Sequence, residues 1–526
     1  MINNLTVKTL KLYTILTLAF CLLGINANGK EYGVTSPDGK ISVTVLADDN
    51  LSYIVKYDGD VIVDESEISM TLADGTVVGA SPRITSAKKK NIVENITAPL
   101  YRQKEFVSEA NELTLKMKGG FSVIFRAYNE GVAYRFATAQ KGETVVMSET
   151  AEVNFGKDNL AWLPYSTNEK NQMAMAFQNF YDNCRLSEAK DILAFLPVTV
   201  DCGEVKVTVM ESDLESYPGM FISVDKEKKG LDGVFAPYPK KTDFYPWRVQ
   251  EYVTETEDFI AKTTGPRNYP WRVLAVTSCD TQLPVNNLVY ALASPSRIED
   301  TSWIKGGQVA WDWWNDWGLS GVDFVAGINM DTYRYYIDFA SANGIGNVVL
   351  DEGWYNPKSG DMLTVIPELD LAELIAYGKE RNVNIILWTV FNVLDSQLEE
   401  ACAKYKEMGV VGFKVDFLDR DDQTAVEMAY RIADACARHQ LTLDYHGFYK
   451  PTGLNRTYPN VINFEGVFGM EEVKWAVPGT DMPLYDVTFP FIRMASGPVD
   501  YTPGAMTNAS KADFQAIYYN PMSMGT

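Results

Sequence analysis

The spacing of apolar residues changes once along this chain, near Ser296, and this change constrains the fold most strongly. Before it, from about Glu31 to Leu288, short runs alternate apolar and polar residues, and Gly, Asn and Asp turns separate them. Runs such as 41–45 and 131–136 are typical of strands in an antiparallel sheet, because successive strand side chains face opposite sides. The pattern predicts a large antiparallel β-sandwich over residues 29–295.

After Ser296, short apolar runs alternate with segments in which apolar residues recur at helical spacing. The predicted strands are 308–313, 348–350, 383–388, 412–417, 441–445 and 461–464, and clear helices are expected at 332–343, 398–408 and 424–438. Strands that alternate with helices favour a (β/α)8 TIM-type barrel over residues 296–526. A doubly wound open sheet is the alternative, but it would need a Gly-rich phosphate loop after a strand, and none is evident in the sequence.

The predicted barrel is short of strands. Besides the six above, a seventh is expected near 491–494, and no eighth precedes Thr526. We therefore expect the sequence to be a fragment, truncated before the last strand and before a C-terminal β domain.

The N-terminus has the pattern of an export signal. Lys8 and Lys11 precede an apolar run at 12–25, and small residues follow near Ala27. A membrane anchor is the alternative, but this run is short for a transmembrane span. We expect residues 1–28 to be a cleaved signal peptide, and the mature protein to be periplasmic or secreted.

The charge and the histidine content exclude several classes of function. A net charge of −22 argues against nucleic acid or an anionic membrane as a partner, since both require basic surfaces. The sequence has two histidines, His439 and His446, which disfavours a three-histidine metal site and most Ser-His-Asp arrangements. These features suit a soluble enzyme that acts on a neutral ligand, and we expect a monomer.

The predicted strand 412–417 carries two charges inside an apolar run. Lys414 and Asp416 share one face of it, because strand side chains alternate. A buried carboxylate is costly unless it is paired or used. Asp416 therefore becomes a candidate functional residue.

Polar residues recur at the C-terminal ends of the other predicted strands, where parallel barrels hold their active sites. They include Trp313, Asp351, His446 and Glu465, with Glu471 shortly after. Each one alone could be a helix cap or a solvated loop charge. Recurrence at five strand ends favours one shared site.

Carboxylates together with tryptophans suggest a sugar site. Glycoside hydrolysis uses a pair of carboxyl groups, of which one is protonated and the other ionised. Lys414 would favour the ionised form of Asp416, which suits a nucleophile. The acid must then come from another strand, and the candidates are Glu465 and Glu471.

The most specific stretches are 306–314, 351–354, 412–417 and 446–471. They resemble glycoside hydrolase family 97, whose members are α-glucosidases and α-galactosidases with an N-terminal β-super-sandwich and a barrel. Inverting members carry a glutamate directly after the histidine that matches His446, and here that position is Gly447. Retaining members use an aspartate that matches Asp416. The resemblance thus implies a retaining exo-acting α-galactosidase with Asp416 as nucleophile and Glu471 as general acid/base.

The resemblance also implies a calcium ion (Ca2+) beside the acid. Its ligands would be Glu465, Glu471 and a residue from the sandwich domain, for which we choose Glu211. Four further residues are expected to line the sugar subsite: Trp313, Asp351, Lys414 and His446. Two alternatives stay open, namely an α-glucosidase with the same machinery and a truncated carbohydrate-binding protein without catalysis.

Overall fold

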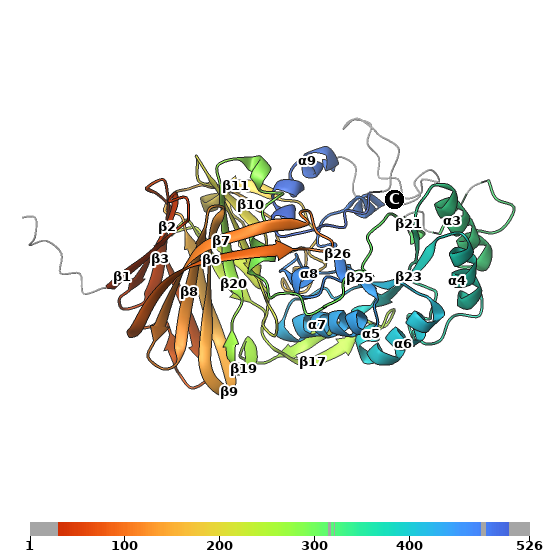
Figure 1. Ribbon diagram of the computed structural model, residues 1–526, viewed down its shortest axis with the longest axis horizontal. Helices are drawn as coiled ribbons and strands as arrows, with labels where there is room; N and C mark the ends of the chain where they lie inside the picture. Colours follow the sequence, from red (N-terminus) through yellow and green to blue (C-terminus); the bar gives the residue numbers. More distant parts are fainter. Residues whose placement is uncertain (1–29, 314–316, 320, 475–479, 504–526) are drawn as a thin grey trace, which may run out of the picture.

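A computed structural model of the chain describes residues 30–313, 317–319, 321–474 and 480–503. The described residues form a β-rich domain, drawn at the left of Figure 1, and an α/β domain at the right. The predicted signal peptide lies outside the described residues. Among the described residues, no helix is long and apolar enough to cross a membrane.

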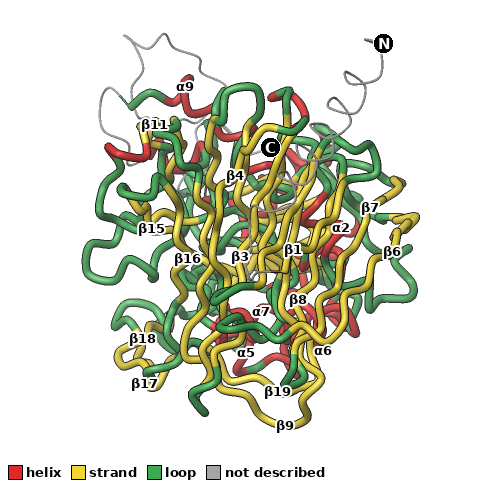
Figure 2. Tube along the Cα trace, turned by 90° about the vertical axis from the view of Figure 1, so that its left-hand side faces the viewer, coloured by secondary structure: helices red, strands yellow, loops and turns green. Residues whose placement is uncertain are grey.

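The β-rich domain is built almost entirely of antiparallel strands (Figure 2). They are β1 Lys30–Thr35, β2 Ile41–Ala47, β3 Leu51–Tyr57, β4 Asp60–Leu72, β5 Val77–Val78, β6 Ile84–Thr97, β7 Glu105–Met117, β8 Phe121–Tyr128, β9 Gly131–Asn154, β10 Leu160–Leu163, β11 Asp182–Arg185, β12 Ala194–Phe195, β13 Val198–Asp201, β14 Lys206–Ser212, β15 Met220–Asp225, β16 Gly230–Phe235, β17 Pro239–Phe244, β18 Glu251–Thr256, β19 Ala261–Asn268 and β20 Trp271–Thr277. The long strand β9 pairs with β4, β8, β16, β19 and β20 and so joins the layers.

The predicted alternation is clear in β8, where Phe121, Val123 and Phe125 are buried and the residues between them are partly exposed. These side chains enter a core shared by the strands of the β-rich domain. The helix α2 (Leu288–Leu292) then leads out of this domain.

The α/β domain contains a six-stranded parallel sheet whose strands follow in chain order. Its elements are β21 Val309–Trp311, α3 Met330–Ala342, β22 Asn347–Leu350, α4 Leu371–Glu380, β23 Asn384–Val390, α5 Phe391–Ser396, α6 Leu398–Met408, β24 Gly412–Asp416, α7 Gln423–Arg438, β25 Thr442–Tyr445, α8 Leu454–Thr457, β26 Val461–Phe464 and α9 Met482–Asp486. The six strands predicted from the sequence are all present. Because neighbouring strands are parallel, their C-terminal ends lie at one edge of the sheet.

The helix ends follow local capping chemistry. Asp422 caps α7 by accepting hydrogen bonds from the backbone of Thr424 and Ala425, and α6 ends at Gly409 in the left-handed conformation. At α3 the residue that caps the helix is Asn329, which accepts from the Thr332 backbone N–H.

The predicted seventh strand near 491–494 is wrong. Two 3₁₀ turns, Phe489–Phe491 and Arg493–Ala495, occupy this stretch. Pro490 lacks the N–H that a sheet ladder needs, and buried Arg493 donates to the carbonyls of Glu465 and Gly466. These contacts direct the following residues back toward β26, where the Asp500 N–H donates to the Phe464 carbonyl at 2.7 Å.

Buried charges join the two domains. Glu211 on β14 pairs with Arg272 on β20 at 2.7 Å and with Lys450, which follows β25. The Asp213 N–H also donates to the Thr452 carbonyl at 2.9 Å. The β-rich domain is therefore attached next to the C-terminal ends of the parallel strands.

Candidate active site

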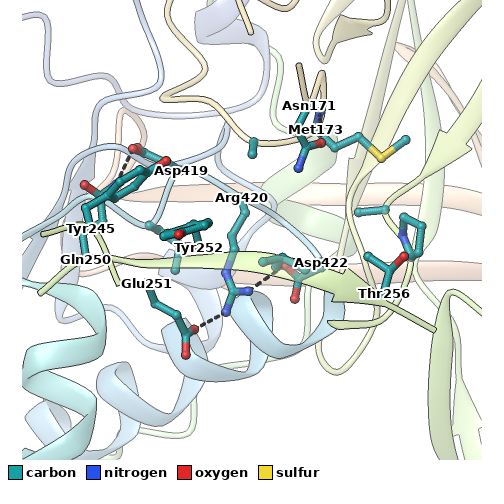
Figure 3. A pocket seen from close by; sticks show the side chains of 15 residues that line it. Asn171, Met173, Tyr245, Gln250, Glu251, Tyr252, Thr256, Asp419, Arg420 and Asp422 are labelled. Carbon is teal, nitrogen blue, oxygen red and sulfur yellow. Dashed lines mark hydrogen bonds and ion pairs between the residues drawn. The ribbon is translucent and has the colours of Figure 1, made fainter. Parts of the chain in front are cut away.

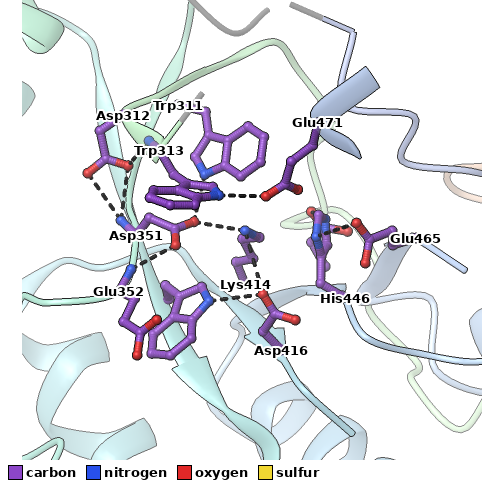
Figure 4. A network of polar contacts seen from close by, with 12 residues as sticks. Trp311, Asp312, Trp313, Asp351, Glu352, Lys414, Asp416, His446, Glu465 and Glu471 are labelled. Atoms are coloured by element: carbon purple, nitrogen blue, oxygen red, sulfur yellow. Dashed lines mark hydrogen bonds and ion pairs between the residues drawn. The ribbon is translucent and has the colours of Figure 1, made fainter. Parts of the chain in front are cut away.

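Strand β24 places Lys414 and Asp416 on the same side, as the alternation predicted, and every residue of this strand is buried. The Lys414 Nζ lies 2.8 Å from Asp351 Oδ2 and 3.8 Å from Asp416 Oδ2 (Figure 4). It also lies 4.3 Å from the centre of the Trp311 ring. One ammonium group thus serves two carboxylates at the ends of β22 and β24.

The Asp416 carboxylate is held by two donors. The Trp388 indole donates to Oδ2 at 3.1 Å, and the backbone N–H of Phe417 donates to Oδ1 at 2.7 Å. Burial raises the pKa of Asp416, while the charges of Lys414 and His446 act against this rise. Lys414 therefore favours the ionised form, as its position predicted, but burial outweighs it.

Asp351 has the opposite balance. Its Oδ2 accepts from the Trp311 indole at 2.6 Å and from Lys414. Burial alone would raise its pKa, but the Lys414 charge and these hydrogen bonds bring the pKa of Asp351 below its ordinary value. Lys414 therefore stabilises the ionised form of Asp351.

Asp312 binds the backbone next to Asp351 and was not predicted as a site residue. It is fully buried and accepts from the backbone N–H groups of Trp313 and Asp351 at 2.8 and 3.2 Å. Burial and the nearby Asp351 charge raise the pKa of Asp312 to about 7. The carboxyl group thereby holds the ends of β21 and β22 together.

Glu471 faces the same space from the 3₁₀ turn Met470–Lys474. The Trp313 indole donates to its Oε1 at 2.5 Å, and its own backbone N–H donates to the Thr502 hydroxyl at 3.1 Å. The Lys414 ammonium interacts electrostatically with Glu471 as well as with Asp416. The two predicted catalytic carboxyl groups, Asp416 and Glu471, therefore both interact with the Lys414 ammonium.

His446 is enclosed by carboxylates. Its Nε2 lies 2.7 Å from Asp500 and 3.3 Å from Asp444, and its Nδ1 lies 3.3 Å from Glu465. Burial would lower the pKa of His446, but Glu465 and Asp444 raise it well above its ordinary value. These carboxylates favour the protonated form of the ring, whose charge acts to lower the pKa of Asp416.

Asp500 is a site residue that the sequence analysis missed. It follows the stretch 491–494, which was wrongly predicted as a strand, and the two 3₁₀ turns there bring it to His446. Burial would raise the pKa of Asp500, but the hydrogen bond and the charge of His446 bring it below its ordinary value. No strand-end pattern marks such a residue.

Within the part of the chain that the structure describes, two groups of side chains have the spacing of metal ligands. One is His446, Glu465 and Glu471, and the other is Asp444, His446 and Asp500, with the ligand atoms of each group within 4.8 Å of one another. The two glutamate carboxylates suit a hard cation such as calcium, which takes oxygen ligands. His446 could join them only through a neutral ring nitrogen, since a metal ligand histidine is not protonated at that atom.

The structure does not bring Glu211 into either group. Glu211 is fully buried, its Oε1 accepts from the Met220 N–H at 3.0 Å, and its carboxylate pairs with Arg272 and Lys450. Two cations already pair with this carboxylate, so its charge is balanced without a metal ion.

The backbone excludes a side chain at Gly447. Its φ of +50° lies in the left-handed region, and a Cβ there would stand 2.7 Å from the Phe417 backbone nitrogen and from Asp419 Oδ1. The position directly after His446 therefore cannot hold a carboxylate while the residues after β24 keep this path.

Comparison with known families assigns both domains. The family model "Glycosyl-hydrolase 97 N-terminal" matches residues 34–295, and "Glycoside hydrolase 97" matches residues 313–467. A relative named retaining alpha-galactosidase, from Bacteroides thetaiotaomicron, is 47% identical over 98% of this chain and 79% of its own length. The chain belongs to glycoside hydrolase family 97.

Three other similar proteins share less of their sequence with this chain. A probable retaining alpha-galactosidase of Streptomyces bingchenggensis is 25% identical, over 86% of this chain and 66% of its own length. A family 97 enzyme from Pseudoalteromonas sp. strain K8, solved with acarbose, superposes with a TM-score of 0.76 at 23% identity and covers 90% of this chain and 74% of its own. A β-arabinopyranosidase superposes with a TM-score of 0.77 at 20% identity, over 91% and 76%. The solved structures share the fold of this chain. As a member of family 97, the chain is a glycoside hydrolase.

Proposed function

We propose that this enzyme is a retaining exo-acting α-galactosidase that hydrolyses terminal α-galactosides by double displacement. The observation that carries the proposal is the contrast between Asp416, which two donors hold at the end of β24, and Gly447, where the backbone excludes a base. The name of the relative that is 47% identical supports the same stereochemistry and the same sugar.

In the first step Asp416 attacks the anomeric carbon, and Glu471 gives a proton to the departing glycosidic oxygen. In the second step Glu471 takes a proton from water, the water oxygen attacks the anomeric carbon, and the bond to Asp416 breaks. The two inversions restore the α configuration. This mechanism predicts carboxyl groups about 5–5.5 Å apart, whereas inverting enzymes keep them at least about 6.5 Å apart.

The surrounding charges suit these steps. Lys414 and His446 counter the effect of burial on Asp416, so that the nucleophile can be ionised. Asp351 is held ionised by Lys414 and presents acceptor oxygens to sugar hydroxyl groups. Trp313, which orients Glu471, would offer an apolar face to the sugar.

We propose that Glu465 and Glu471 hold a calcium ion, on the chemistry of their carboxylates. When bound, the ion would add positive charge beside the acid and orient it. We expect calcium to raise the melting temperature of chelator-treated enzyme and Glu465→Gln to abolish this rise. A melting temperature that calcium leaves unchanged in the wild type would contradict the site.

The substrate is tested by comparing kcat/KM for an aryl α-galactoside and the matching aryl α-glucoside. The proposal expects the galactoside to be strongly preferred. A preference for the glucoside would instead support an α-glucosidase with the same machinery. A protein that binds sugar without hydrolysing either compound would support the carbohydrate-binding alternative.

We also propose a barrel fold for the α/β domain, export of the protein and a monomeric state. The consecutive parallel strands β21–β26 suit six strands of a (β/α)8 barrel. The sequence of residues 1–28 suits export to the periplasm or the medium. Mass spectrometry of exported protein should find a mature N-terminus near residue 29, and light scattering should give the mass of a monomer.

A further inference from the structure

The hairpin formed by β17 and β18 carries a stack of aromatic rings that the mechanism above does not use. The rings of Tyr252 and Tyr245 are stacked with centres 4.6 Å apart, and those of Tyr245 and Trp247 with centres 4.7 Å apart. Trp247 ends the stack and is 56% exposed, which is high for so large an apolar side chain. One face of the indole lies against Tyr245, and more than half of the Trp247 residue is exposed to solvent.

The turn of this hairpin is fixed to the edge of the sheet that holds Asp416. Arg248 donates to both carboxylate oxygens of Glu352, at 2.9 and 2.5 Å, directly after β22. Its guanidinium carbon lies 3.8 Å from the centre of the Phe417 ring, one residue past Asp416. The Asn392 amide donates to the Val249 carbonyl at 2.7 Å, just after β23. The two residues that follow Trp247 are therefore bound next to the ends of β22, β23 and β24.

The inner side of the hairpin is held by polar contacts (Figure 3). Gln250 donates to Asp419 Oδ2 at 2.7 Å, and Glu251 pairs with Arg420 at 2.6 Å. These residues line a cavity of about 100 Å³ with Tyr245 and Tyr252. The anchored side fixes the ring stack in place, while Trp247 at its end remains exposed.

We propose that the exposed indole of Trp247, backed by Tyr245, binds the pyranose ring of the leaving saccharide. This rests on the proposed function, in which the terminal sugar occupies the buried site at Asp416. In this proposal the rest of the substrate extends past the ends of β22 and β24, where Arg248 pairs with Glu352 and packs on Phe417. A neutral sugar ring suits this surface, since its C–H face packs on an aromatic face without requiring a charge.

The test compares two substrates with the same galactosyl group. α-Galactosyl fluoride has one atom as its leaving group, whereas melibiose, an α-1,6-linked galactosyl glucose, has a sugar. Trp247→Ala should lower kcat/KM for melibiose about tenfold and leave that for the fluoride within about twofold. Trp247→Phe should restore most of the loss. Phe244→Ala removes an aromatic ring from the same hairpin that is 49% exposed and should change neither substrate.

Three results would overturn the proposal that Trp247 is a platform for the leaving saccharide. Equal losses on both substrates would make Trp247 a support for the hairpin, and unchanged values on both would show that it does not touch substrate. If Phe244→Ala lowered kcat/KM for melibiose as much as Trp247→Ala does, the loss could not be assigned to the ring stack.

Failure of the proposed function would look different. If the wild type prefers glucosides, the same ratio is measured with α-glucosyl fluoride and an α-linked glucose disaccharide, and a selective loss on the disaccharide still supports the platform. If the wild type hydrolyses neither, saturation-transfer NMR with melibiose decides. Trp247→Ala should then weaken the signals of the glucose protons, and unchanged signals would contradict the platform.

Discussion

Two buried groups of charges in this enzyme differ in how they are neutralised. The domain-joining group contains Glu149, Glu211, Arg272 and Lys450, and Arg272 donates to both glutamates while Lys450 pairs with Glu211. The catalytic group instead divides Lys414 between Asp351 and Asp416, at 2.8 and 3.8 Å. Closely paired carboxylates suit attachment of the domains, whereas a carboxylate with a distant partner suits chemistry.

The same comparison explains why Glu211 was chosen as a metal ligand. In the sequence, an acid of the sandwich domain looks the same whether it pairs with a cation or binds an ion. Its partners, Arg272 and Lys450, are 61 and 239 residues away, so no local pattern indicates them. Burial separates the two groups poorly as well, because both are buried.

The largest effect is expected at the nucleophile. Asp416→Asn should lower kcat by roughly 10⁴-fold or more, because both steps pass through this carboxylate. Its melting temperature should equal or exceed that of the wild type, since burial already disfavours the charge on Asp416. Azide should restore turnover to Asp416→Ala as an external nucleophile and give the β-galactosyl azide. Substantial activity without azide would exclude Asp416 as nucleophile.

The second effect is on stability. Glu211→Gln should lower the free energy of unfolding by about 3–5 kcal/mol, because Arg272 and Lys450 lose a buried partner. The folded variant should keep the wild-type kcat. Denaturant unfolding and initial rates at a permissive temperature measure the two quantities. A large loss of kcat in folded protein would place Glu211 in the catalytic group after all.

The third comparison removes one cation from each group. Lys414→Met removes the charge that lowers the pKa of Asp416, so that pKa should rise, and the acid limb of kcat/KM should move up by about 1–3 pH units. Lys450→Met should reduce stability and leave the acid limb in place. An unmoved limb in Lys414→Met would show that another group controls it.

The smallest effect concerns one hydrogen bond. Trp388→Phe removes the indole donor 3.1 Å from Asp416 and should lower kcat about tenfold. Trp354→Phe is the matched control, because Trp354 is equally buried and its indole donates to the Trp388 carbonyl at 2.8 Å. Equal changes in kcat for the two variants would indicate loss of packing rather than loss of a donor.

Much of the parallel sheet could be predicted because its signals are local. The alternation in β24, the Asp422 cap of α7 and the glycine that ends α6 each depend on a few adjacent residues. The 3₁₀ turns at 489–495 could not, since an apolar run resembles a strand until tertiary contacts such as those of Arg493 compete with the ladder.

The site residues likewise fall into those with a local sequence signal and those without one. The sequence predicted residues at strand ends, and Figure 4 shows Asp351, Lys414, Asp416, His446, Glu465 and Glu471 around one space. It missed Asp312, Trp388 and Asp500, whose roles depend on contacts between elements. Their positions follow from packing and from turns, which have no spacing rule in the sequence.

The central claim is that Asp416 acts as a nucleophile because the position of Gly447 holds no base. The most direct measurement is proton NMR of the galactose first released from an aryl α-galactoside, recorded before the anomers equilibrate. Double displacement through Asp416 predicts that the α-anomer forms first. Initial release of the β-anomer would show a single displacement by water and would contradict the claim.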